Sequence, residues 1–420
     1  MRRRFLIKNN TSNISKLFFK NSFLIGFGTI LGFANVSIAS RSLGLTEYGN
    51  FLNFNISAQI IIGFSLLGLS ELSVKYFYSN YGLNKYLNIV FIGIFQALVS
   101  CIFIVFYCLY TKTNFLLFLP FFLALVVNKF AGIFLRASNK ISLSNFANSI
   151  YFNLIILLTL LLSPISDFRV LIISFFSITF FILIIITPKI YNSFRKKSIF
   201  LPFFDKKLIY ENLGIGCLVI LNGFFATIDQ LIVSKVFGVE NLALYKISLT
   251  IFLAGSFPHV VINTIAGPKI SKLCFKKKFK NLLYFLNKIS IIQIFLSFLA
   301  VFSLFIIIQL SGDLIFNADT KPGVWVYIFM SIASASASVR GFSTIILIQN
   351  SKFREMFTGQ SIYIGILMLS FYLIYSIFPQ ITSIYFSFAF AHIIFTLWIL
   401  KKTNHALNQK INSKIGQFNS

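Results

Sequence analysis

The stretch Ser40–Phe51, which reads SRSLGLTEYGNF, has a second copy 194 residues later: Ser234–Tyr245 reads SKVFGVENLALY. Aligned without gaps, both copies carry a Ser, a basic residue, a Gly between apolar residues and a closing aromatic residue. The register extends beyond the motif, because Asn35 falls on Asp229. We therefore expect two copies of one membrane bundle, each turning here from its first helix into its second.

The composition places these copies in a membrane. Only 11% of the 420 residues are charged and the mean hydropathy is +0.85, which excludes an ordinary soluble domain. Apolar runs of about 20 residues, enough to cross a bilayer, recur along the chain. Runs such as Leu154–Leu162 lack the alternation of a membrane barrel strand. The predicted fold class is an all-α integral membrane protein.

The formal charge of +27 could indicate nucleic-acid binding. Most Lys and Arg residues, however, lie in short segments between apolar runs, where the positive-inside rule places them on the cytoplasmic side. The charge therefore predicts a multi-pass protein with both termini in the cytoplasm and no nucleic-acid partner.

Twelve spans are predicted, six in each half, with loops too short to form a separate domain. The expected organisation is an N-terminal six-helix bundle (1–195), a basic cytoplasmic linker (196–207), a C-terminal six-helix bundle (208–402) and a cytoplasmic tail (403–420). The expected spans are 17–39, 51–74, 87–110, 114–135, 146–163, 168–188, 211–234, 244–267, 284–310, 324–348, 359–378 and 382–400.

Motifs of enzymes are missing from the sequence. It contains no phosphate-binding Gly loop, no GxSxG elbow, and no HExxH or CxxC pair. The three histidines lie far apart, so we predict no metal site, no cofactor and no catalytic residues. His392, within the last span, is interpreted as a hydrogen-bonded packing residue, with proton transfer as the alternative.

Two cations fall inside expected spans, Lys129 in the fourth and Arg340 in the tenth. When LRASNK (Leu135–Lys140) is matched to LIQNSK (Leu347–Lys352), Arg340 falls beside Lys129, at a similar depth. A charge near the bilayer centre is costly and should face a polar interior. A shared cationic cavity is one interpretation; snorkelling of each side chain is the other.

Asp229 is the clearest acid within a span, and its partner Asn35 keeps the size without the charge. It could be a proton or cation site, an ion-pair partner of a cavity cation, or a carboxylate satisfied by neighbouring helices. Arg41 and Lys235 lie at the outer ends of spans one and seven. They form a candidate outer mouth for an anion, or else cap their helices through the dipole.

The motif around Gly44 resembles the R-x-LG-x-x-x-YG-x-F signature of Wzx-type polysaccharide-unit flippases, members of the multidrug/oligosaccharidyl-lipid/polysaccharide exporter superfamily. Asn222–Ser248, including Asp229, is similar to that family's N-x-x-x-x-x-x-D…G-x-x-x-x-x-x-Y pattern, and Pro268–Leu273 (PKISKL) resembles its eighth-span exit. Leu242 and Ala243 depart from the Tyr-Gly pair in the second copy. The resemblance covers the whole chain.

The resemblance implies two six-helix bundles around a central cavity that work by alternating access. The implied cargo is an undecaprenyl-pyrophosphate-linked oligosaccharide, an O-antigen or capsule repeat of lipopolysaccharide or polysaccharide biosynthesis. It would cross the bacterial inner membrane with ion coupling, next to a polysaccharide polymerase and chain-length proteins. The alternatives are a drug/cation antiporter of the same superfamily, which would favour acidic cavity residues, and a membrane polysaccharide polymerase, which would need a sizeable outer loop.

Overall fold

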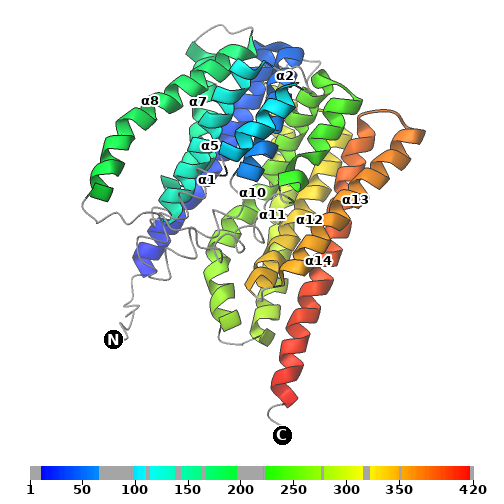
Figure 1. The fold of residues 1–420 in the computed structure, drawn as a ribbon. Helices are drawn as coiled ribbons and strands as arrows, with labels where there is room; N and C mark the ends of the chain where they lie inside the picture. Colours follow the sequence, from blue (N-terminus) through cyan, green and yellow to red (C-terminus); the bar gives the residue numbers. More distant parts are fainter. Residues whose placement is uncertain are drawn as a thin grey trace.

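The computed structural model shows an all-helical molecule whose helices run along one common direction (Figure 1). It describes residues 11–65, 96, 98–109, 114–137, 143–144, 146–162, 167–195, 221, 223–275, 279–315, 322–349 and 352–416. Throughout these ranges no strand occurs, which confirms the predicted fold class. The expected linker at 196–207 and residues 211–220 of the seventh span lie outside them.

The repeated motif forms the same turn in both copies. Gly44 and Gly238 adopt positive φ angles of 76° and 88°, a conformation that glycine adopts without a Cβ clash. The residue before each glycine closes the preceding helix with a matching backbone hydrogen bond. Leu43 N donates to Ala39 O at 3.0 Å, and Phe237 N donates to Val233 O at 2.9 Å. The repeat read from the sequence is therefore present in the backbone.

The helices that follow these turns begin earlier in the chain than the sequence predicted. α2 begins at Gly44, seven residues before the expected span, and α10 begins at Val239. α14 continues past the expected last span to Gly416. The helices are α1 (Thr11–Ser42), α2 (Gly44–Ser65), α5 (Phe115–Ala137), the π-helix η1 (Phe146–Tyr151), α7 (Phe152–Leu162), α8 (Phe168–Arg195), α10 (Val239–Phe275), α11 (Phe279–Ile315), α12 (Val324–Gln349), α13 (Phe353–Ile377) and α14 (Thr382–Gly416), with further helical segments at Leu98–Leu109 and 223–236.

Four of the described helices are long and apolar enough to span a membrane by themselves. They contain the stretches Phe115–Ile133, Tyr284–Leu310, Arg354–Ile377 and Thr382–Gln409. Each coincides with an expected span, so the molecule is a multi-pass membrane protein.

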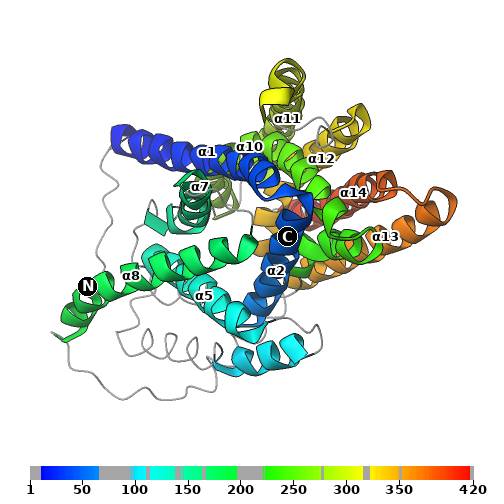
Figure 2. The ribbon, with the colours of Figure 1, turned by 90° about the horizontal axis from the view of Figure 1, so that it is seen from above.

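The helices pack as two groups that follow the two halves of the chain. In the first, α1 packs against α7 and η1, and α5 packs against α2 and α8. In the second, α12 packs against α10, α11 and α14, and α13 packs against α14. The groups meet where α10 contacts α1 and α2 (Figures 1 and 2). The first residues of α1 and the last residues of α14 lie at the opposite end of the molecule (Figure 1).

The two repeated turns touch each other at this meeting point. Thr46 Oγ1 donates a 2.6 Å hydrogen bond to Glu240 Oε1, and these two residues hold equivalent positions in the repeat. Lower down, Ser234 Oγ donates to Asn53 Oδ1 at 3.0 Å. A Cβ atom at Gly49 would clash with the backbone oxygen of Val239, so only glycine permits this approach.

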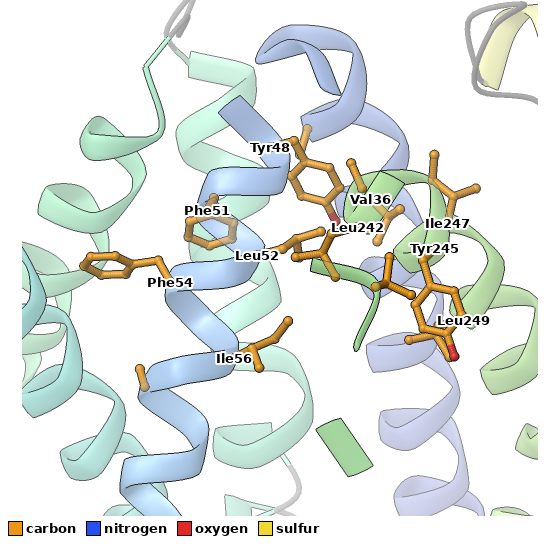
Figure 3. Close-up of a cluster of buried hydrophobic side chains, with 14 of the residues drawn as sticks. Val36, Tyr48, Phe51, Leu52, Phe54, Ile56, Leu242, Tyr245, Ile247 and Leu249 are labelled. Atoms are coloured by element: carbon orange, nitrogen blue, oxygen red, sulfur yellow. The ribbon is translucent and has the colours of Figure 1, made fainter. Parts of the chain in front are cut away.

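Buried apolar side chains continue the contact below the turns. Tyr48 and Leu52 of α2 lie with Leu242 of α10 and Val36 of α1, all less than a tenth exposed (Figure 3). Residues from both halves thus share one hydrophobic core at this end of the molecule.

We expect Gly49→Ala to lower the apparent melting temperature of the detergent-purified protein, because the new methyl group must push α2 away from Val239. Gly63→Ala is the matched control in the same helix, since its Cβ would meet nothing within 4 Å. There the substitution should leave stability unchanged or raise it slightly, as alanine favours helix. Equal melting temperatures for the two variants would contradict the tight contact.

Candidate functional site

Asp229 lies inside the second helix group, on the helix over 223–236, and its side chain is 2% exposed. Tyr245 Oη donates a 2.6 Å hydrogen bond to its Oδ2. The turn at Gly238 produces this pair, because it places residues before and after it on adjacent antiparallel helices at similar depth. Lys246 interacts electrostatically with the same carboxylate. The second carboxylate oxygen, Oδ1, is buried without a hydrogen-bond partner in the described part of the chain.

The first copy lacks this arrangement. Asn35 and Phe51 occupy the positions that Asp229 and Tyr245 hold in the second copy. Asn35 is also buried, but its Nδ2 donates to the backbone oxygen of Asn153 at 2.7 Å, joining α1 to α7. Asn35 thus holds two helices of the first group together. The pair that contains a titratable acid, Asp229 with Tyr245, lies in the second group.

Arg340, on α12, is held against α14. Its Nη1 donates to His392 Nδ1 across 3.2 Å, which requires that this ring nitrogen be unprotonated. The guanidinium carbon lies 4.4 Å from the ring centroid of Phe395 and 5.5 Å from that of Phe225. Aromatic faces attract a cation most strongly where water is excluded. The arrangement therefore keeps a charged guanidinium within an apolar bundle.

Tyr363 of α13 packs beside Arg340's aromatic and histidine partners. Its ring centroid lies 4.1 Å from that of Phe225 and 5.1 Å from that of His392. Its hydroxyl is buried with no hydrogen-bond partner within the described ranges. We call Asp229, Tyr245, Arg340, Tyr363 and His392 the C-terminal polar cluster.

Polar side chains extend from this cluster toward α11. His259 of α10 interacts electrostatically with Arg340, and its Nδ1 lies 3.2 Å from Gln293 Nε2. Ser297 of α11 and Ser338 of α12 share a 2.7 Å hydrogen bond, and both are fully buried. The SIASASAS run of α12 (331–338) therefore packs closely and also provides hydrogen-bonding groups to the interior.

The remaining sequence-predicted residues lie elsewhere. Lys129 is exposed on α5, in the first helix group, so the structure does not place it in the C-terminal polar cluster. Arg41 is exposed in the last turn of α1, and Lys235 is exposed near the end of the 223–236 helix. These two cations flank the meeting point of the groups, one beside each repeated turn.

Sequence reasoning missed Tyr245 and Tyr363 as members of the site. The sequence shows Tyr245 as the closing aromatic residue of the motif, but its hydrogen bond to Asp229 depends on how α10 packs. His392 was expected to be a hydrogen-bonded packing residue, and it does bond to Arg340. Tyr363 is one of many aromatic residues in apolar runs, so no pattern singles it out.

Comparison with known proteins gives a fold but no sequence family. No family model and no curated protein sequence matches the chain. The crystal structure of a mutant of the Vibrio cholerae MATE transporter VcmN matches with a TM-score of 0.62 and 14% identity, over 95% of this chain and 98% of that one. The inward-facing conformation of a multidrug resistance MATE family transporter of the MOP superfamily matches with a TM-score of 0.63 and 10% identity, over 92% and 96%.

The chain has the fold of MATE transporters. Because the likeness covers nearly all of each chain, the expected architecture of about 12 membrane helices is confirmed. At these identities the likeness concerns the fold, and the cargo must be argued from the residues of this chain.

Removing the hydroxyl that contacts Asp229 should destabilise the second group. We expect Tyr245→Phe to lower the free energy of unfolding by about 1.5–3 kcal/mol, the usual value of a hydrogen bond to a charged group. Tyr385→Phe is the matched control: its hydroxyl bonds the neutral Ser248 Oγ at 3.0 Å, and its loss should cost about 1 kcal/mol. Denaturation in detergent, followed by circular dichroism, measures both.

A double-mutant cycle between Asp229 and Tyr245 separates the effect of the charge from the effect of side-chain packing. In an Asp229→Asn background, Tyr245→Phe should cost less than in the native protein, because a neutral amide oxygen accepts more weakly than a carboxylate. An unchanged cost would show that the hydrogen bond is not charge-assisted.

Proposed function

We propose that the protein is a flippase that moves an undecaprenyl-pyrophosphate-linked oligosaccharide, an O-antigen or capsule repeat unit, across the bacterial inner membrane. The observation that carries the proposal is Arg340, a cation held inside a membrane bundle by a neutral histidine and two aromatic rings. A pyrophosphate and sugars cannot cross hydrocarbon unaided, so their passage requires polar and cationic groups within the bundle. The sequence signature around Gly44 supports this cargo.

The packing of the two groups supports alternating access as the mechanism. They are joined at one end by the repeated turns and the core around Tyr48, while the first residues of α1 and the last residues of α14 lie at the other end (Figure 1). With the termini in the cytoplasm, the joined end faces outward. Cargo would then be received from the cytoplasmic side, and release would require the repeated turns to separate. A polymerase and chain-length proteins would receive the product at the outer face.

Loss of the two cations within membrane spans should reduce transport without removing the protein from the membrane. In cells that depend on this gene for surface polysaccharide, Arg340→Ala should reduce surface polymer several-fold, and adding Lys129→Ala should reduce it further. Lipid-linked units should accumulate at the cytoplasmic face. Lys352→Ala removes an exposed cation at the start of α13 and serves as the control. Export at the native level in the variant that lacks both Arg340 and Lys129 would contradict a role for these two cations in transport.

A cross-link between the repeated turns should stop transport. We replace the four native cysteines with Ala and introduce Thr46→Cys with Glu240→Cys, whose native oxygens lie 2.6 Å apart. A short thiol-specific cross-linker should join them in the membrane and abolish export, and a cleavable linker should restore export on reduction. Either cysteine alone is the control. Full export by the cross-linked protein would exclude separation of this end during transport.

A drug/cation antiporter is the second candidate, and Asp229 favours it, because a buried carboxylate suits a cationic cargo. One matching structure is described as a multidrug resistance transporter. Growth on toxic organic cations distinguishes the two functions. An antiporter would protect cells in a manner lost with Asp229→Asn, whereas the proposed flippase leaves resistance unchanged and restores surface polysaccharide in a deletion strain.

A further inference from the structure

A groove of about 470 Å³ lies between α11 and α12, away from the C-terminal polar cluster. α11 contributes Phe295, Phe298, Phe302 and Phe305, and α12 contributes Tyr327 and Ile328. The volume is within the range of sites that bind small molecules. α11 lies at the periphery of the second group (Figure 2), so the groove is on the outside of the bundle.

The side chains that line the groove favour a hydrocarbon as its ligand. They are formed almost entirely by aromatic and aliphatic side chains, with Ser331 at one edge. The hydroxyl of Tyr327 is buried and has no hydrogen-bond partner in the described part of the chain, so it does not turn outward to meet a polar ligand. A sugar or a phosphate bound here would lose its hydration without replacement, at high cost.

The groove faces the lipid bilayer, which contains hydrocarbon chains. Its α11 wall belongs to the span Tyr284–Leu310, most of whose surface is not covered by the rest of the protein. Phe295 and Phe302 are 66% and 59% exposed, which in a membrane span means exposed to lipid chains. The groove thus opens directly onto the bilayer interior.

The two sides of α12 fit the two ends of an amphiphile. Ser331, at the groove, and Arg340, in the polar cluster, are nine residues apart, which is about 13.5 Å along the helix and two and a half turns. They therefore point to opposite sides of α12, one toward lipid and one toward the interior. A molecule with an anionic head and a hydrocarbon chain complements this division, because its head requires Arg340 and its chain requires the groove.

We propose that the groove binds the polyprenyl chain of the transported lipid, an inference that rests on the proposed flippase function. Five aromatic side chains line it, and flat rings stack well on the planar double-bond units of an isoprenoid. Such a chain has fewer freely rotating bonds per carbon than a saturated acyl chain and loses less entropy on being held. The tail stays at the membrane side of α12 while the head moves through the interior.

The test blocks the groove with a bulky side chain and compares lipids whose polyprenyl chains differ in length. Ile328→Trp places a large ring in the groove, and Ile306→Trp is the matched control: both isoleucines are 41% exposed, and Ile306 lies on α11 outside the lining. Purified protein in liposomes is given a lipid-linked oligosaccharide with the full polyprenyl chain, and separately one shortened to two isoprene units. We measure the rate at which the head reaches the opposite leaflet.

We expect Ile328→Trp to slow the long-chain lipid several-fold and to leave the short-chain lipid unaffected, while Ile306→Trp changes neither rate. Leu299→Trp, on the opposite wall, should repeat the result if the first variant is poorly folded. Native rates with the long chain in both groove variants would overturn the proposal and show a groove filled by ordinary acyl chains. Equal slowing of both lipids would also overturn it. If the native protein moves neither lipid, the flippase function itself fails.

Discussion

The approach of Gly49 to the backbone of Val239 is the contact on which the two-group arrangement depends. It brings two repeated turns together, so that Thr46 and Glu240, equivalent residues of the two copies, can share a hydrogen bond. The second copy has Ala243 at the position of Gly49, which shows that the requirement for glycine is not symmetric. The contact lies at one end of long helices, so the two groups are coupled there. In the proposed alternating-access mechanism, this is the end that must open to release cargo.

The two groups have different interiors, although one motif organises both. In the first, aromatic rings dominate: Phe54, Phe118 and Phe121 pack with centroids 4.8–5.5 Å apart. In the second, Asp229 and Tyr245 replace Asn35 and Phe51 and share a hydrogen bond, and Arg340 bonds to His392, whose ring packs against Tyr363. Buried charges are costly and persist where partners satisfy them or function requires them. The two copies therefore share the turn, while the carboxylate–tyrosine pair and the arginine–histidine pair occur in the second copy.

This division suits the movement of a large amphiphile. A polar cluster within one group can hold an anionic head, because Arg340 keeps its charge against aromatic rings and a neutral histidine. Asp229 Oδ1 and the Tyr363 hydroxyl, which have no hydrogen-bond partner among the described residues, leave hydrogen-bonding capacity that a proton, a water molecule or a hydroxyl of the proposed cargo can use. On the other side of α12, an aromatic groove faces the lipid. One helix thus separates the environments that the two ends of the proposed cargo need.

The sequence by itself determined the membrane class, the approximate number of membrane helices and the repeat, because hydropathy and a motif with glycine at a fixed position are local properties. Gly44 and Gly238 had to end their helices wherever those helices were packed. The sequence also placed Asp229 and Arg340 inside spans. Only the tertiary structure decided which of the candidates meet. Lys129 and Arg340, which the sequence places at similar depth in the two halves, differ in their surroundings: Lys129 is exposed on α5, whereas Arg340 bonds to His392, since depth does not fix the direction in which a helix face points. Their shared cavity stays a prediction. Tyr245, Tyr363 and His392 join the cluster through contacts among five separate helices, and such contacts depend on how the side chains pack.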